Sequence, residues 1–288
     1  MKGTCTLELS RACFLISCPD RPGIVAAVSN HLFSNGANIV QLDQYSTDPV
    51  EGTYFMRVEF DYPKSNEQAL IEGFLPIAER FGMDWRVAKS DQRKRMAIFV
   101  SKEEHCLLEL LWQWKRKDLN VEIPMVISNH PDLEEAVRPF GIPYYCLPVT
   151  KETKLEQERK ALALMDGKVD FVVLARYMQI LSPEFLAAYP NRVINIHHSF
   201  LPAFVGGKPY EQAYRRGVKI IGATAHYASE ELDAGPIIEQ DVARVDHRDN
   251  VADLKRIGRD IERTVLARAV KWHIEDRILV YQNKTVVF

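Results

Sequence analysis

The chain has 288 residues, of which 47% are hydrophobic and 26% are charged, and its formal net charge is -2. This length and composition are typical of a folded globular protein that is large enough for two domains. The near-neutral charge gives no global attraction to nucleic acid or anionic lipid, and no segment approaches the roughly 18 apolar residues of a membrane span. We therefore expect neither nucleic acid nor a membrane among its partners.

The cysteines and the first residues indicate the compartment. Residues 1–8 lack the apolar segment and the cleavage pattern of a secretory signal. The five cysteines are Cys5, Cys13, Cys18, Cys106 and Cys146. An odd, scattered set without a Cys-x-x-Cys pair favours reduced thiols over a disulfide framework or a zinc site. We therefore expect a cytoplasmic protein.

Residues 1–89 follow the order strand, helix, strand, strand, helix, strand, which is that of a ferredoxin-like βαββαβ unit. Ile24, Val28 and Leu32 have helical spacing and mark the first helix. Asp20 can cap this helix and Pro22 can begin it. The expected strands are 12–17, 39–45, 54–60 and 84–88, and the expected helices are 22–35 and 68–81.

A charged segment without apolar residues follows at 90–95 and is expected to be a linker. Its basic residues could contact nucleic acid, but a solvated linker accounts for them more simply. The sequence therefore predicts one domain at 1–89 and a second at 96–288.

From residue 96 strands and helices alternate, and several strands are apolar throughout. This pattern favours a Rossmann-like α/β domain with a mostly parallel sheet that is buried on both faces. The expected strands are 97–100, 121–128, 144–147, 171–175 and 193–196, with helices at 104–115, 133–140 and 154–165. An extended pair at 219–227 and 236–242, a long helix at 251–274 and a hairpin around Asn283 follow.

The segment NIHHSFLP at 195–202 carries the most informative side chains. Because strand side chains alternate between faces, Asn195 and His197 project together, where an α/β sheet opens into its ligand crevice. Asp233 follows in the turn LDAGP at 232–236. An amide that donates to an oxyanion, an imidazole and a carboxylate base are suited to attack on an acyl carbon.

Each of these residues also has a simpler interpretation. Asn195 could cap the strand, His197 could be a core histidine, and Asp233 could initiate a turn. A metal site made of His197, His198, His226 and Asp233 is another alternative, although no helical His-x-x-x-His pattern supports it. His198 should face away from Asn195 and His197, and we expect it to be structural.

NIHxSFLP with the later LDxGP resembles the folate-dependent formyltransferase fold family, and the resemblance covers about 95–288. It implies that Asn195, His197 and Asp233 act on the formyl group of 10-formyltetrahydrofolate, with no metal and no other cofactor. It also implies that the segment after the strand at 171–175 lines the pterin pocket, largely through backbone groups. These residues are Tyr177, Met178, Gln179, Ile180 and Leu181. Gln179 stands where relatives often carry Arg.

Members of that family differ in the acceptor of the formyl group. Glycinamide ribonucleotide formyltransferases have a Gly-rich phosphate loop after the first strand of this domain, and methionyl-tRNA formyltransferases add a basic C-terminal domain. Here 101–105 is SKEEH, with no glycine and two carboxylates, and the sequence ends at Phe288. Water is then the simplest acceptor. The resemblance thus implies hydrolysis to tetrahydrofolate and formate, which feeds one-carbon metabolism and purine synthesis.

CPDRPGI at 18–24 and NGANI at 35–39 resemble motifs of ACT domains, ferredoxin-like modules that often bind amino acids where subunits meet. The resemblance implies a homo-oligomer with a small amino-acid effector, glycine or methionine, bound by Asp20, Gly23 and Asn38. Gly23 would let a ligand approach the backbone. The alternative is a helix that only supports oligomerisation.

Two other functions are compatible with the same three residues, Asn195, His197 and Asp233. One is formyl transfer to a small unphosphorylated amine, which only an acceptor assay separates from hydrolysis. The other is an amino-acid or folate sensor that has lost activity, although the intact Asn195, His197 and Asp233 argue against it.

Overall fold

The computed structural model describes residues 8–48, 51–203 and 209–288. The chain folds into two compact units. The first comprises the described residues up to Arg93 with Asp276–Leu279 and Val286–Phe288, and the second comprises Lys94–Glu275 with Val280–Thr285. Cys5 lies outside the described residues, and the other four cysteines are free.

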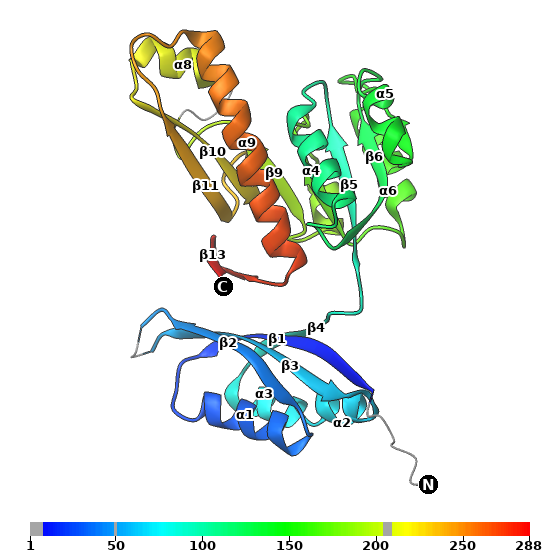
Figure 1. The fold of residues 1–288 in the computed structure, drawn as a ribbon, viewed down its shortest axis with the longest axis vertical. Coiled ribbons are helices and arrows are strands. Elements are labelled where there is room, and N and C mark those ends of the chain that lie inside the picture. Colours follow the sequence, from blue (N-terminus) through cyan, green and yellow to red (C-terminus); the bar gives the residue numbers. More distant parts are fainter. Residues whose placement is uncertain (1–7, 49–50, 204–208) are drawn as a thin grey trace. The chain divides into compact units, whose positions relative to one another are not determined.

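The first unit contains β1 (Leu9–Pro19), α1 (Ile24–Ser34), β2 (Asn38–Ser46), β3 (Thr53–Pro63), η1 (Lys64–Asn66), α2 (Glu67–Glu72), α3 (Leu75–Phe81) and β4 (Asp84–Lys89). The strands form an antiparallel sheet in the order β2-β3-β1-β4. The helices cover one face of this sheet (Figure 1). Phe14, Phe60 and Phe74 meet in the core between them. The predicted ferredoxin-like fold is confirmed.

The predicted single helix at 68–81 is wrong, because α2 ends at Glu72 and α3 begins at Leu75. Pro76 lies in the first turn of α3, where its missing N–H costs no hydrogen bond. In the interior of one continuous helix the same proline would remove a hydrogen bond and clash with the preceding turn. The chain therefore starts a new helix.

Asp20 does not cap α1, contrary to the prediction. The residue before α1 is Gly23, whose φ is 97°, and no side chain caps this end. The Asp20 carboxylate instead accepts a hydrogen bond from Ser46 Oγ at 2.5 Å. The left-handed backbone of Gly23 delays the start of the helix, so that Asp20 lies too far upstream.

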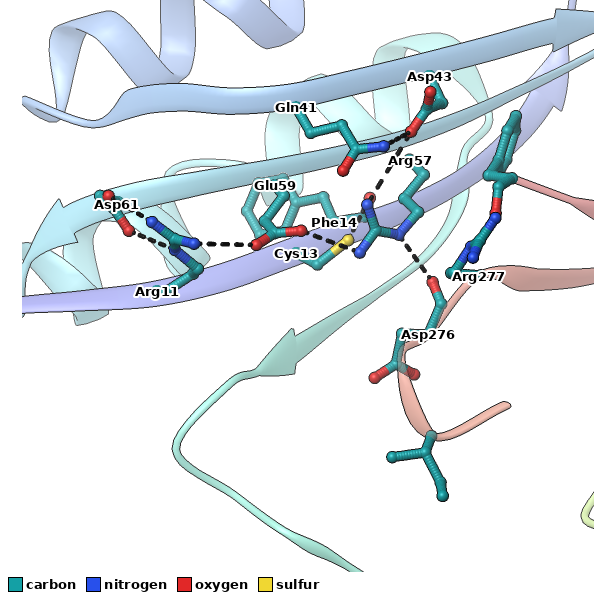
Figure 2. Close-up of polar contacts among 12 residues, drawn as sticks. Arg11, Cys13, Phe14, Gln41, Asp43, Arg57, Glu59, Asp61, Asp276 and Arg277 are labelled. Carbon is teal, nitrogen blue, oxygen red and sulfur yellow. Dashed lines mark hydrogen bonds and ion pairs between the residues drawn. The ribbon is translucent and has the colours of Figure 1, made fainter. Parts of the chain in front are cut away.

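A polar cluster on β1 and β3 binds a residue from near the C-terminus (Figure 2). Arg57 is 6% exposed, and its guanidinium donates to Glu59 at 3.0 Å and to the Asp276 carbonyl at 3.1 Å. Arg11 donates to Asp61 at 2.7 Å in the same cluster. A buried guanidinium needs such partners. These bonds account for the grouping of Asp276 with the first unit.

The second unit contains β5 (Lys94–Val100), α4 (His105–Lys115), β6 (Val121–Ser128), α5 (Glu134–Val137), η2 (Arg138–Phe140), β7 (Tyr144–Cys146), α6 (Lys154–Met165), β8 (Phe171–Leu174), α7 (Pro183–Ala188), β9 (Val193–His197), α8 (Pro209–Arg216), β10 (Ile220–Tyr227), β11 (Ile237–Arg244) and α9 (Val251–Ile274). The hairpin of β12 (Ile278–Tyr281) and β13 (Lys284–Val287) closes the chain. The seven-stranded sheet has the order β11-β10-β9-β8-β5-β6-β7.

Strands β5 to β9 run parallel, whereas β10 is antiparallel to both β9 and β11. The predicted mostly parallel α/β domain is confirmed. Helix α9 packs on β9, β10 and β11 (Figure 1). Because β8 and β9 are parallel neighbours, their carboxyl ends meet at one edge of the sheet, which is where such sheets bind ligands.

The predicted helix at 251–274 is confirmed, and a capping box of Asn250 and Asp253 begins it. Two short helices, α7 and α8, were not expected. The cap of α7 could have been recognised, because Ser182 precedes Pro183 and accepts a hydrogen bond from the Phe185 N–H.

The units differ in two respects from the expected domain limits, which stay a prediction. Lys94 and Arg95, expected in the linker, already belong to β5, where Arg95 pairs with Asp170 at 2.8 Å. Residues 276–279 and 286–288 group with the first unit. No helix in the described part of the chain is long and apolar enough to cross a membrane.

Candidate active site

A pocket of about 280 Å³ opens at the carboxyl ends of β8 and β9. The residues predicted for the formyl group and for the pterin all line it: Asn195, His197, Asp233, Tyr177, Met178, Gln179, Ile180 and Leu181. Arg176, His198 and His226 line it as well. The fold thus brings together side chains from three segments that are far apart in the sequence.

Asn195 is held by His226, because β10 pairs with β9 in a register that places the two residues opposite each other. His226 Nδ1 lies 2.9 Å from the carbonyl oxygen of Tyr227, so Nδ1 carries the hydrogen and Nε2 accepts. Burial is the main reason that the pKa of His226 is lowered, which keeps this ring neutral. Asn195 Nδ2 lies 3.1 Å from His226 Nε2 and donates to it. Its second N–H is left for the pocket.

The sequence indicated His226 only as a possible metal ligand. Its relation to Asn195 depends on the register of an antiparallel pair, and a single sequence does not fix that register. No local signal in the sequence could have revealed it.

His197 pairs with Asp233, with 3.2 Å between Nδ1 and the carboxylate Oδ2. Each of the two side chains is 7% exposed. The other ring nitrogen, Nε2, is buried and has no hydrogen-bond partner among the described residues. An unsatisfied buried polar atom is costly, and a polar group of a ligand in the pocket would satisfy it.

Asp233 adopts a left-handed backbone conformation with φ 57°, which Asp tolerates better than most residues. Burial raises the pKa of this carboxyl, but the hydrogen bond and the charge of His197 outweigh burial, so the pKa lies below its usual value. The second oxygen, Oδ1, lies 3.8 Å from His226 Nε2. The carboxylate is therefore ionised near neutral pH, a point that the sequence left open.

The segment 177–181 forms a largely apolar wall of the pocket. Met178 and Ile180 are 58% and 56% exposed, and Tyr177 packs edge-on against Phe99 with 5.3 Å between ring centroids. The Met178 N–H donates to Ser101 Oγ at 2.9 Å. The segment after β5 thus supports the wall, and exposed apolar side chains here suit a flat heterocycle.

Strand alternation predicts that His198 faces away from the site, and this is wrong. β9 ends at His197, so the alternation no longer applies, and His198 lines the pocket. Its ring centroid lies 5.3 Å from that of His197. Burial and the nearby charge of Arg176 lower the pKa of His198 to about 3, so this ring is neutral.

Comparison with known proteins identifies the family. Residues 94–270 match the family model for formyl transferase, and residues 14–70 match that for the ACT domain. The chain is 56% identical over 277 residues to a formyltetrahydrofolate deformylase of Bacillus subtilis (strain 168), across 95% of this chain and 92% of the relative. The chain belongs to the formyltetrahydrofolate deformylase family.

Solved structures agree with this deformylase assignment. A formyltetrahydrofolate deformylase from Pseudomonas syringae pv. tomato aligns with a TM-score of 0.92 and 50% identity, across 98% of this chain and 96% of that one. A glycinamide ribonucleotide transformylase from Symbiobacterium toebii aligns with a TM-score of 0.65 and 27% identity. The alignment covers 69% of this chain and 96% of that one. The transformylase shares only part of the architecture, whereas the deformylase shares nearly all of it.

The residues predicted for an effector do not meet within one copy of this deformylase-family chain. Asp20 and Gly23 lie between β1 and α1, and Asn38 begins β2. Ser46, which donates to Asp20, ends the same nine-residue strand. At the rise of a β-strand, Asn38 and Ser46 are roughly 26 Å apart.

One group among the described residues places three metal-type ligand atoms within 4.8 Å of one another: His105, Cys106 and Glu262. It is not the group of His197, His198, His226 and Asp233 that the sequence offered as a metal alternative. In the deformylase fold it lies where the first turn of α4 meets α9.

Proposed function

We propose that the chain hydrolyses 10-formyltetrahydrofolate to tetrahydrofolate and formate in this pocket. One observation carries the proposal: Asn195, His197 and Asp233 share a pocket with the apolar wall at 177–181. The flat pterin lies along the wall, and the N10-formyl carbon of the folate then lies at the end of β9. The relatives that the chain matches over nearly its whole length are named formyltetrahydrofolate deformylases.

Two donors stabilise the oxyanion that forms when water attacks the formyl carbon. Asn195 donates the Nδ2–H that His226 does not use. His197 pairs with Asp233 through Nδ1, and its Nε2, which has no partner among the described residues, is the second donor to the formyl oxygen. Donors fixed before the reaction stabilise the charge that develops in the transition state.

Asp233 acts as the general base. Its ionised carboxylate takes a proton from the attacking water as the new C–O bond forms. The proton then passes to N10, the C–N10 bond breaks, and tetrahydrofolate and formate leave. No cofactor is needed, because these side chains carry the charge and the protons.

The direct test is to incubate the pure protein with 10-formyltetrahydrofolate in the absence of any amine acceptor. We expect one formate for each tetrahydrofolate formed. Formate release that requires an added amine, or formylation of that amine, would place the chain among the transferases.

A phosphorylated amine should neither accept the formyl group nor compete with the folate. The segment after β5 carries Glu103 and Glu104 and supports the pocket wall through Ser101, so it offers no anion cradle. Glycinamide ribonucleotide, with unphosphorylated glycinamide as the matched compound, is incubated with enzyme and 10-formyltetrahydrofolate, and products are analysed by mass spectrometry. Stoichiometric formylated product would contradict this expectation.

The ACT domain supports a proposal of regulation by a small amino acid, glycine or methionine. Asp20 and Gly23 lie at one end of β2 and Asn38 at the other, so one ligand can contact them all only if a second copy supplies part of the site. We therefore propose a homo-oligomer in which the effector binds between two ACT domains. An effector changes activity only if it binds one state better than another.

Amino-acid binding is expected on the full chain and should weaken in Asp20→Asn. A panel of amino acids is measured by calorimetry and by initial rate, and light scattering gives the assembly state. Asp84→Asn, an exposed carboxylate of the same unit, is the control. If no amino acid binds and the chain is monomeric, the regulatory proposal fails.

We also propose a cytoplasmic location. The four described cysteines are free, and Cys13, Cys18 and Cys106 are buried. Reduced thiols of this kind are typical of a reducing compartment.

A further inference from the structure

A buried polar cluster adjoins the active-site pocket. We call it the Glu262 cluster, and it consists of Glu262, His105, Tyr210 and Arg176. Glu262 comes from α9 and is 1% exposed. Its carboxylate accepts a hydrogen bond from the Tyr210 hydroxyl at 2.6 Å and lies 2.8 Å from His105 Nε2. Arg176 Nε forms an ion pair with the oxygen that His105 contacts, at 3.4 Å, and makes no hydrogen bond to any described residue.

The Glu262 cluster includes a strained backbone at Arg176 and requires a glycine inside α9. Arg176 has a left-handed backbone with φ 65°, a conformation that side chains other than Asn, Asp and Gly rarely adopt. Gly258, one turn before Glu262 on α9, has no room for a side chain, because a Cβ there would lie 1.8 Å from the Tyr210 hydroxyl oxygen. Glycine inside a helix is less favourable than alanine. The chain thus accommodates both a strained cation and a close approach of Tyr210 around one carboxylate.

The Glu262 cluster determines the charge that the pocket presents. Burial raises the pKa of Glu262, but the hydrogen bond from His105 and the charge of Arg176 hold the pKa below its usual value. Glu262 is therefore an anion. Arg176 is the one Lys or Arg among the described residues that line the pocket. The buried carboxylate of Glu262 neutralises the charge of Arg176. The described pocket lining therefore offers no uncompensated Lys or Arg to an anionic ligand.

This arrangement bears on the choice of acceptor. Two solved structures that share part of the fold are named glycinamide ribonucleotide transformylase and phosphoribosylglycinamide formyltransferase, with TM-scores of 0.65 and 0.61. The acceptor in these names carries a phosphate. A phosphate is recognised by free cationic donors, above all by guanidinium groups. In this chain the guanidinium at the pocket already has an internal anion beside it.

We propose that Glu262 is a specificity-determining residue of the hydrolysis: its carboxylate neutralises Arg176, the one Lys or Arg among the described residues that line the pocket, so that small oxyanions and anionic acceptors are not bound there and water is left as the acceptor. The same compensation lets the formate product leave, since formate is itself a small oxyanion. This inference rests on the proposed function of the pocket, because it concerns which molecules reach the formyl carbon.

The test is Glu262→Gln, which keeps the shape of the side chain and removes its charge. Hydrolysis is measured in a series of inorganic phosphate, and separately of formate, with ionic strength held constant by sodium chloride. In the variant Arg176 is no longer neutralised, so the inhibition constant for each anion should fall by about tenfold or more, the effect of about 1.4 kcal/mol. Phosphate should also raise the thermal midpoint of the variant but not that of the wild type.

Asp260→Asn is the matched control, because it removes the same charge from an exposed position on the same helix. The double variant Glu262→Gln/Arg176→Gln should lose the gained anion sensitivity. If Glu262→Gln does not fold, Glu262→Asp replaces it. The shorter side chain withdraws the carboxylate from Arg176, so we expect an intermediate rise in anion sensitivity.

The outcomes separate the two proposals. A folded Glu262→Gln or Glu262→Asp whose anion inhibition equals that of the wild type overturns the role of Glu262 and leaves hydrolysis intact. A wild type that releases no formate overturns the proposed function itself. A loss of activity without gained anion sensitivity in the folded variant also overturns the inference, because it would show only structural damage.

Discussion

Asp233→Asn should lower the turnover of 10-formyltetrahydrofolate by roughly 10²–10⁴, the usual contribution of general acid–base catalysis, while the folate still binds. Asparagine has nearly the same shape but takes up no proton, and the wild-type carboxylate is ionised because His197 outweighs its burial. Limiting rates and folate affinity are measured on the same preparations. We expect a large change in the first and a small change in the second.

Glu231→Gln is the control for this substitution, since it removes an exposed carboxylate two residues away in the same loop. The pH dependence of the wild-type rate is a second test of the role of Asp233. Because the pKa of Asp233 is lowered, the base stays ionised as the pH falls through the ordinary range for a carboxylate, and wild-type activity tied to it should persist there. Hydrolysis by Asp233→Asn at near the wild-type rate would remove Asp233 from the mechanism.

Asn195→Ala should lower the limiting rate by roughly 10²–10³, the usual effect of removing one oxyanion donor. The amide is held by the neutral His226 with one N–H directed to the pocket, so its loss removes a donor that was already in place. Limiting rate and KM are measured separately, because a donor that acts in the transition state changes the rate more than the affinity.

Asn120→Ala, at an exposed position of the same unit, should leave both parameters unchanged. If Asn195→Ala weakens folate affinity and keeps the limiting rate, then Asn195 only positions the substrate. In that case His197 Nε2, which has no partner among the described residues, would have to stabilise the oxyanion alone.

Local sequence patterns were sufficient for most of the fold. The apolar strands at β5, β6 and β8 and the long helix α9 could be located because their periodicity and caps lie within a few residues. The break between α2 and α3 was missed although Pro76 marks it, because the apolar spacing continues across the break. The short helices α7 and α8 give too few turns for a clear period.

Motifs in the sequence were enough to predict which side chains act on the formyl group, since Asn195, His197 and Asp233 lie in long, specific motifs. The fold places all three in one pocket with 177–181, and their roles there stay predictions. The contacts between distant segments became visible only in the fold: the pairing of His226 with Asn195, the place of His198, and the contact of His105 with Glu262. The physical reason is that periodicity reports which face of an element is buried, whereas register and packing decide which side chain lies opposite. The ionisation of Asp233 also depends on such a contact, because the hydrogen bond and the charge of His197 outweigh the burial of the carboxyl, so a single sequence does not reveal it.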